Sequence, residues 1–296
     1  MRTLAAWLLS VCIASCTDPV MIDTGIETIP CLAVDGMVTD QLCRQWVRLS
    51  TTEDFFSAST EIPAISGAAI QVSCGEEVFV YEEDASNPGT YLSTTPFAGV
   101  AGRTYRVDID ASVHGVAAHY WAEDIMPEPG FQLDSIDYAY SDLVKDLWTI
   151  AIWGKDRFKL SSRYLAQVGI NNHFKPFDQS YEIPDDHFDG MTAERFTALP
   201  LKHTMETWRA YGECCKPLEA GDVVSVRVSS LSEGYGEYLS GYFHFITGTI
   251  PILTDQPTNL ATNVHSSEPV VGYFGACAVC EASCVVGDPF KKEYRR

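Results

Sequence analysis

The cysteines are the residues of this chain with the widest chemistry, and ten are present. Cys277, Cys280 and Cys284 follow a Cys-x2-Cys-x3-Cys spacing near the C-terminus, and Cys214 and Cys215 are adjacent. Thiolates at such spacings bind zinc or an iron–sulfur cluster, or they form disulfides. A tetrahedral zinc takes four ligands and would leave one of these five cysteines unused. A redox-active Cys-x-x-Cys usually lies at the start of a helix, whereas this segment has the pattern of a strand and loop. The redox environment of the chain therefore decides between these uses.

An acidic stretch provides a second candidate, because carboxylate oxygens on a loop can bind calcium. The stretch Asp185-Asp186-His187-Phe188-Asp189-Gly190 lacks the alternating ligand spacing of an EF-hand. A solvated acidic loop is the commoner explanation. We therefore predict no metal site and keep Asp185, Asp186 and Asp189 only as weak metal candidates.

No motif in the sequence places a nucleophile beside a base. The histidines form no His-Glu-x-x-His pair, and there is neither a Gly-x-Ser-x-Gly elbow nor a phosphate-binding glycine loop. A Ser-His-Asp triad can assemble from residues far apart in the sequence, so a hydrolase stays as a third hypothesis. We predict a protein that is not an enzyme, with no catalytic residue and no cofactor.

The N-terminal stretch determines the environment of the cysteines. Arg2 precedes an apolar run of about ten residues, which fits a signal peptide and is too short to span a bilayer. Ile13-Ala14-Ser15-Cys16 resembles a bacterial lipobox, and that resemblance implies that Cys16 is acylated and becomes the mature N-terminus. The alternative is an ordinary secretory signal with Cys16 as a spare thiol. We predict a signal peptide over residues 1–15 and a lipidated tether over residues 16–30, held in the membrane by acyl chains on Cys16.

Export leaves an even number of cysteines in the mature protein. Cys12 is removed with the leader and Cys16 takes the lipid, so eight of the ten remain. An even number in an exported chain favours disulfides over a metal site, although the pairing stays open. The disulfide candidates are Cys31, Cys43, Cys74, Cys214, Cys215, Cys277, Cys280 and Cys284.

Composition excludes some classes of partner. With 40 acidic and 20 basic residues the formal net charge is −20, which argues against binding to nucleic acid or to anionic headgroups. Hydrophobic residues make up 46% of the chain, enough for a buried core. Beyond the leader, no apolar run approaches the length of a transmembrane helix.

The elements that must position these residues are mainly strands. A period of two and recurrent turn residues predict about seven short strands between Cys31 and Trp121, typical of an immunoglobulin-like or transthyretin-like β-sandwich. Pro127 and Gly130 mark the expected boundary. We predict a mainly β fold: an N-terminal β-sandwich domain over residues 31–126 and a second β-rich domain with long loops over residues 130–290.

The second domain has three clear elements. Asp222–Leu231 is the clearest strand, and Val270–Val279 reads as a closing strand. Glu233–Ile246 is the best helix candidate, with an aromatic face at spacings of three and four that is either core or a carbohydrate or peptide platform. Residues 291–296 form a basic tail that we expect to be frayed.

Several short motifs occur in the order found in one known family. They are Val34-Asp35-Gly36, Ser66-Gly67-Ala68, Gly89-Thr90-Tyr91, Gly102-Arg103-Thr104-Tyr105, Leu133-Asp134-Ser135-Ile136, Gln256-Pro257-Thr258-Asn259, Thr262-Asn263-Val264 and Gly272-Tyr273-Phe274-Gly275-Ala276. Through them the chain resembles the DUF4249 family of Bacteroidetes outer-membrane lipoproteins over nearly its whole mature length. Cys277 and Cys280 depart from the small or polar residues expected around the closing strand.

This resemblance implies a location and a class of partner, but no activity. It implies a lipoprotein anchored in the outer membrane, at the cell surface or the periplasmic face. It also implies an accessory or binding subunit of a TonB-dependent transporter or of another outer-membrane complex. The alternative hypothesis is a lipid-anchored protein that captures a glycan, peptide or metal nutrient directly.

Overall fold

The protein is mainly β, as the sequence predicts, with one α-helix among the described residues. A computed structural model of the chain describes residues 30–52, 63–156, 163–175, 181–183, 192–202, 209, 212–247 and 260–294. Its elements are β1 (Leu32–Thr39), β2 (Trp46–Thr51), β3 (Ala69–Cys74), β4 (Glu77–Glu83), β5 (Thr90–Ser93), β6 (Thr104–Val113), β7 (Val116–Ile125), β8 (Phe131–Tyr140), β9 (Leu147–Asp156), β10 (Arg163–Ile170), β11 (His173–Phe174), β12 (Tyr181–Ile183), β13 (Thr192–Lys202), the 3-10 helix η3 (Gly212–Cys215), β14 (Val223–Leu231), α3 (Glu233–Thr247) and β15 (Val270–Val285).

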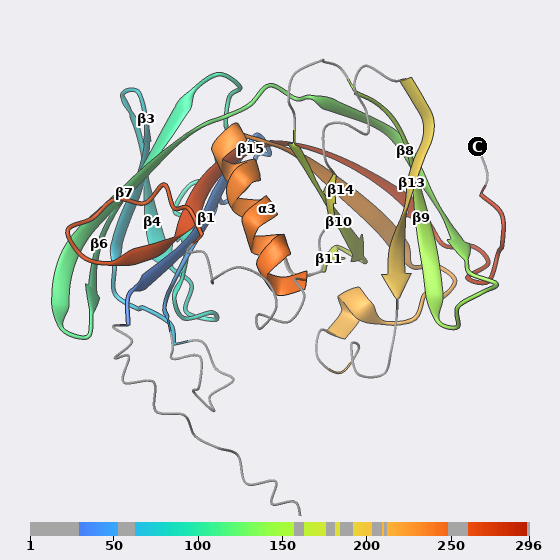
Figure 1. Cartoon of the computed structure of the whole chain (residues 1–296), viewed down its shortest axis with the longest axis horizontal. Coiled ribbons are helices and arrows are strands. Elements are labelled where there is room, and N and C mark those ends of the chain that lie inside the picture. The colour runs from blue at the N-terminus through green and yellow to red at the C-terminus, as the bar shows by residue number, and fades with distance from the viewer. Residues whose placement is uncertain are drawn as a thin grey trace, which may run out of the picture.

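One large sheet runs through the whole molecule. Its strand order is β11-β10-β14-β15-β1-β2-β5-β4-β3-β6-β7, with β12 also paired to β10, and β13-β9-β8 form a second sheet of three strands. The molecule has two lobes side by side, with α3 between them (Figure 1). The N-lobe consists of β1 to β7, and the C-lobe is built around β8 to β10 and β14.

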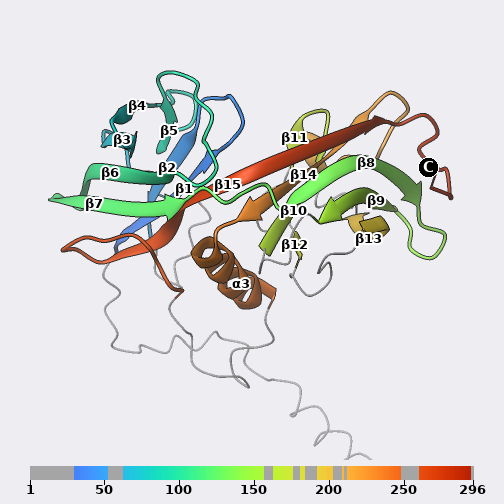
Figure 2. The ribbon, with the colours of Figure 1, turned by 90° about the horizontal axis from the view of Figure 1, so that it is seen from above.

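The long strand β15 belongs to both lobes (Figure 2). Its first half pairs in parallel with β1, from Leu32↔Val270 to Thr39↔Cys277. Its second half pairs antiparallel with β14, from Leu231↔Cys277 to Val223↔Val285. The predicted closing strand was therefore too short, because the pairing with β14 extends it beyond Val279.

The N-lobe sheet curls around one core. The alternation in β6 is typical: Tyr105, Val107, Ile109, Ala111 and Val113 are buried, and the residues between them reach solvent to differing degrees. Inward side chains from β1 to β7 and from β15 belong to a single hydrophobic cluster. The predicted sandwich is thus formed by one continuous sheet that folds over on itself.

The C-lobe core lies between the two sheets. Ile150 and Ile152 of β9 and Val224, Val226 and Val228 of β14 are buried in one cluster. Side chains of β8 and β10 complete this cluster. The three-stranded sheet therefore covers one face of β10, β14 and β15. Seven of the nine residues of β14 are buried, including Ser225, Ser229 and Ser230.

Along the chain, the buried residues pass from the N-lobe core to the C-lobe core between residues 126 and 131. Later residues of the chain nevertheless return to the N-lobe core. Met126 belongs to the N-lobe core and Phe131 to the C-lobe core. However, Val264, Phe274 and Ala276 also pack into the N-lobe core. The apolar pattern of the closing strand shows that it is buried, but not which core buries it.

The predicted frayed tail is docked instead. The indole Nε1 of Trp148 donates a hydrogen bond of 2.7 Å to the carbonyl of Pro289, and the amide of Tyr140 donates one of 2.7 Å to the carbonyl of Lys291. We call residues Gly287–Tyr294 the C-terminal clasp. Its partners lie on β8 and β9, about 140 residues earlier in the chain, so the local sequence could not reveal them. Residues 295 and 296 lie outside the described residues.

Within the part of the chain that the structure describes, no helix is long and apolar enough to cross a membrane.

Candidate functional site

Several predicted site residues fall outside the described part of the chain. These are the lipidation candidate Cys16 and the weak metal candidates Asp185, Asp186 and Asp189, and the side chain of Cys214 is also not described. The structure therefore tests neither the predicted lipidation nor the weak metal candidates. Among the described residues, no group of three or more His, Cys, Asp or Glu side chains could hold a metal ion.

Among the described residues, the other seven candidate cysteines form no disulfide. Cys277 points away from Cys280 and Cys284, because residues an odd number apart lie on opposite faces of a strand. Cys280 and Cys284 share a face but lie roughly 13 Å apart along β15, far beyond the reach of a disulfide. These three residues therefore form no disulfide with one another, nor can they bind one metal ion together.

Thiol alkylation would test this assignment. In the native protein we expect rapid labelling at Cys43, which is exposed, and protection of Cys74, Cys215 and Cys277, which are buried. In denaturant without reductant, all seven described cysteines should be labelled. Recovery of disulfide-linked peptides from that sample would contradict the structure.

The junction between the lobes is organised by α3. This helix lies on the outward face of β15, where Tyr235 and Tyr238 pack against Tyr273 with ring centroids 5.2 Å away in each case. Tyr235 and Leu239 are almost fully buried. The aromatic face of the predicted helix is therefore mainly core and not a free binding platform.

One buried carboxylate ties three elements together at this junction. Asp124 lies at the end of β7. Its Oδ2 accepts hydrogen bonds from Ser232 Oγ at 2.8 Å and from the amide of Ala276 at 2.7 Å. Its Oδ1 accepts one from the amide of Ile125 at 2.9 Å. Ser232 also accepts the amide of Tyr235 at 3.2 Å, so it caps the start of α3. Burial raises the pKa of Asp124 to about 6, although these hydrogen bonds act to lower it.

The glycine at position 275 makes room for the helix. A Cβ atom on Gly275 would lie 2.6 Å from the ring of Tyr235. We expect Gly275→Ala to lower the free energy of unfolding by about 1–3 kcal/mol, because the ring or the helix must move. Gly287→Ala is the matched control, since its Cβ would meet nothing within 4 Å. Chemical denaturation of both variants checks this, and equal stabilities would contradict it.

The outward face of β6 and β7 carries a ladder of charged side chains. His119 contacts Asp110 through Nδ1 at 2.9 Å and Asp108 through Nε2 at 3.3 Å. Arg106 forms an ion pair of 3.0 Å with Asp108 and lies 4.3 Å above the ring of Trp121. The indole also packs against the ring of His265, with ring centroids 4.4 Å apart. Trp121 is thus packed between Arg106 and His265 and does not offer an open stacking face.

A shallow groove opens beside this ladder. It has a volume of about 490 Å³ and is lined by Asp110, Ser112 and His119, with small alanines as its floor. The carboxylate of Asp110 and the imidazole of His119 are both substantially exposed there. Such a groove can offer hydrogen bonds to a polar ligand.

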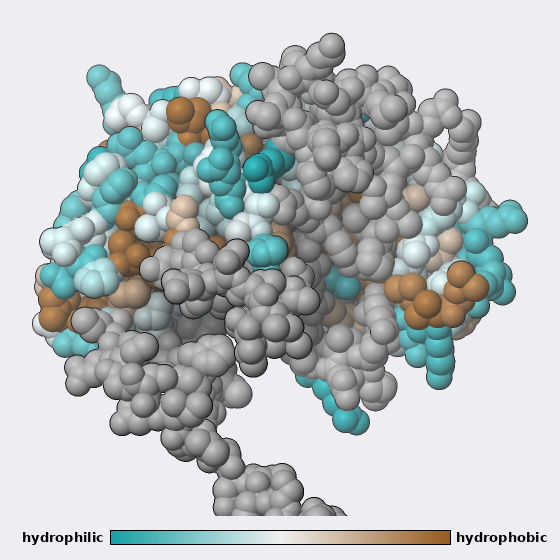
Figure 3. All heavy atoms as spheres, viewed as in Figure 1, coloured by the Kyte–Doolittle hydropathy of each residue, from teal (hydrophilic) through white to brown (hydrophobic). Residues whose placement is uncertain are grey.

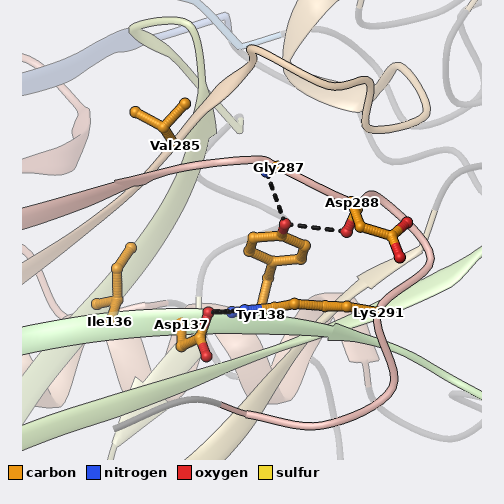
Figure 4. A pocket seen from close by; sticks show the side chains of 7 residues that line it. All are labelled: Ile136, Asp137, Tyr138, Val285, Gly287, Asp288 and Lys291. Carbon is orange, nitrogen blue, oxygen red and sulfur yellow. Dashed lines mark hydrogen bonds and ion pairs between the residues drawn. The ribbon is translucent and has the colours of Figure 1, made fainter.

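A second cavity, of about 310 Å³, lies under the C-terminal clasp (Figure 4). Lys291 forms an ion pair with Asp137 and lies 4.2 Å above the ring of Tyr138. The hydroxyl of Tyr138 donates to the carbonyl of Asp288 at 3.0 Å and accepts from the amide of Gly287 at 2.9 Å. These polar groups are used to hold the clasp in place, so this cavity is mainly structural.

The alternation of residues in β7 could have identified Asp124 as a buried carboxylate from the sequence. Tyr120, Ala122 and Asp124 alternate along β7 and are all buried, so an acid occupies an inward position that period-two reasoning identifies. The pairing of His119 with Asp110 follows from the register of the β6–β7 hairpin around the turn His114-Gly115. The docking of Lys291 on Asp137 had no local signal, because these residues lie 154 positions apart.

Comparison with known proteins places the chain in one family. A family model described as "Domain of unknown function (DUF4249)" matches residues 17–283 of the chain. No curated protein matches the chain. Among solved structures, a DUF4785 family protein from Legionella pneumophila aligns with 8% identity and a TM-score of 0.23, over 67% of this chain and 52% of that one. The chain thus spans about half of that protein's length, and the likeness carries no functional argument.

Proposed function

The chain belongs to the DUF4249 family, and from that premise we propose that it is a non-enzymatic lipoprotein of a Bacteroidetes outer membrane. In this proposal it is an accessory or binding subunit of a TonB-dependent transporter or of another outer-membrane complex. The lipobox-like sequence ending at Cys16 supports the anchor. A tether of residues 16–30 would confine the folded lobes beside a membrane partner, which raises their effective concentration there.

The observation that carries the binding role is an apolar pair on the outward face of β4. Val78 and Val80 are 54% and 53% exposed, although they occupy the face of the strand that usually carries polar residues. Phe79 and Tyr81, between and after them, pack against the N-lobe core. Exposed apolar side chains on a rigid sheet are typical of a protein interface.

Affinity purification of the native lipoprotein in mild detergent tests this role. We expect an outer-membrane β-barrel to co-purify with the parent protein and to be lost from the double variant Val78→Asp/Val80→Asp. Val116→Asp is the matched control, because Val116 is 52% exposed but lies at the start of β7. If the parent protein is recovered alone, or if both variants keep the barrel, the proposal is wrong.

The groove beside His119 favours direct capture of a ligand as a second candidate function. It offers an exposed carboxylate and an imidazole in a volume of about 490 Å³. Thermal unfolding in the presence of glycans, peptides and metal ions tests this, because a ligand bound only by the native state raises the midpoint. A rise that disappears in Asp110→Ala supports capture, and no rise with any ligand class argues against it.

A further inference from the structure

Apolar side chains project from the far end of the C-lobe. The loop between β8 and β9 carries Leu143, which is 95% exposed, and Val144, which is 42% exposed. Phe290 of the C-terminal clasp is 58% exposed. Hydrophobic atoms gather at this end of the molecule, where the β8–β9 hairpin and the clasp lie (Figure 3). We call residues 141–146 together with residues 290–292 the apolar tip.

The two segments of the tip are held side by side. The ring of Phe290 lies 5.2 Å from the ring of Tyr140 at the base of the loop. Lys292 forms an ion pair with Asp142 across the two segments. Within the loop, the hydroxyl of Ser141 accepts hydrogen bonds from the amides of Leu143 and Val144, each of 3.2 Å. The tip is therefore preformed, and little ordering is needed before it binds.

We propose that the apolar tip inserts into the interfacial layer of a phospholipid bilayer. Leu143 touches very little of its own chain, so it projects as a convex point and does not form a flat patch. Leucine, valine and phenylalanine enter a bilayer favourably. A convex apolar point fits a deformable lipid layer without needing a matching pocket.

The charges around the tip are compatible with this placement. The chain as a whole is strongly acidic, with a net charge of −20, so most of its surface is repelled by anionic lipid. At the tip, Asp142 is paired with Lys292, and Asp137 behind it is paired with Lys291. Lys145, an exposed neighbour of the apolar pair, can extend its amine to the headgroups while its stem stays with the apolar residues.

This contact goes beyond the proposed function and does not depend on the lipid at Cys16. An N-terminal tether confines a protein to the membrane but leaves its lobes free to rotate. A second contact through the tip would define which side of the C-lobe faces the bilayer, and would orient the N-lobe accordingly.

Vesicle flotation tests the proposal. The protein is the mature chain from Thr17 onward, which keeps every described residue but lacks the leader and the lipid. The vesicles are phosphatidylcholine alone and phosphatidylcholine mixed with phosphatidylglycerol. We expect the parent protein to float with both. The variant Leu143→Asp/Val144→Asp should lose about tenfold or more in its vesicle partition coefficient, because two inserting side chains become charged.

Leu42→Asp is the matched control, because Leu42 is 78% exposed in the loop after β1, in the other lobe. It should float as the parent protein does, and unchanged unfolding midpoints show that neither variant has lost its fold. Absence of flotation with both vesicles overturns the proposal. Equal flotation of parent and tip variant also overturns it, as does flotation only with phosphatidylglycerol that the tip variant keeps. Lipidation at Cys16 is tested separately, by the mass of the native N-terminal peptide, so the two ideas fail independently.

Discussion

The N-lobe expressed alone, as residues 30–129, will not fold into a stable domain. Its strand β1 would lose the whole parallel pairing with β15, from Leu32↔Val270 to Thr39↔Cys277. Its core would lose Val264, Phe274 and Ala276, which are almost completely buried in the intact chain. The lost apolar burial alone is on the order of 5 kcal/mol, which is comparable to the whole stability of a small domain.

Returning the missing segment should restore folding. Asn263 donates a hydrogen bond of 3.0 Å to the carbonyl of Glu123 near the end of β7, and it also accepts the amide of Phe274 at 3.1 Å. A short Gly/Ser linker can therefore join the N-lobe fragment to residues 260–279. We expect this fusion to show cooperative unfolding by circular dichroism and resistance to proteolysis.

The control for the fusion carries Phe274→Asp, which places a charge at a position with 0% exposure in the core. It should behave like the fragment that lacks the segment. Cooperative unfolding of residues 30–129 alone would show instead that the N-lobe is an independent domain.

A pH effect of defined sign is expected at Asp124. Its pKa rises from 3.8 to about 6 on folding, so the folded state holds this proton more tightly than the unfolded state does. The stability contributed by the group is complete below about pH 4 and is lost as the pH rises to about 6. The change over this window is roughly 2–3 kcal/mol.

Asp124→Asn isolates this effect, because the amide does not titrate. The free energy of unfolding of the parent protein, minus that of the variant, should fall between about pH 4 and pH 6 and then stay level. Desolvation by the surrounding protein also raises the pKa of Asp35 to about 6, and the charge of Arg48 opposes this shift. The side chain of Asp35 nevertheless reaches solvent. It is present in both proteins and cancels in the difference. A difference that is flat with pH, or that rises, would contradict the assignment.

The motif Gly272–Ala276 shows why a family pattern can be recognised without its purpose being understood. In the structure Tyr273 packs on α3, Phe274 fills the N-lobe core, Gly275 leaves space for Tyr235, and the amide of Ala276 binds Asp124. These residues connect the two lobes. Their order in the sequence carries the resemblance, but most of their partners lie far away in the chain, as with Ala276 and Asp124 at a separation of 152.

The sequence by itself determined the mainly β class, the strand alternation and the position of α3. These follow from periods of two and of three to four, which depend only on neighbouring residues. It also indicated the change of core between Met126 and Phe131 through local proline and glycine. By contrast, cysteine spacing suggested a cluster that alternation along β15 separates, because spacing in sequence does not fix which face a side chain occupies.

Only the tertiary structure decided that β15 completes both lobes, that the basic tail is clasped, and that Leu143 and Phe290 project together. Each of these depends on contacts between segments far apart in the chain, such as Trp148 and Pro289 at a separation of 141. A strand's own pattern specifies a buried face and an exposed face, but its partners are chosen by the competition of all strands for one sheet. The described cysteines, whose type has the widest chemistry in the sequence, are therefore dispersed over several elements and form no disulfide.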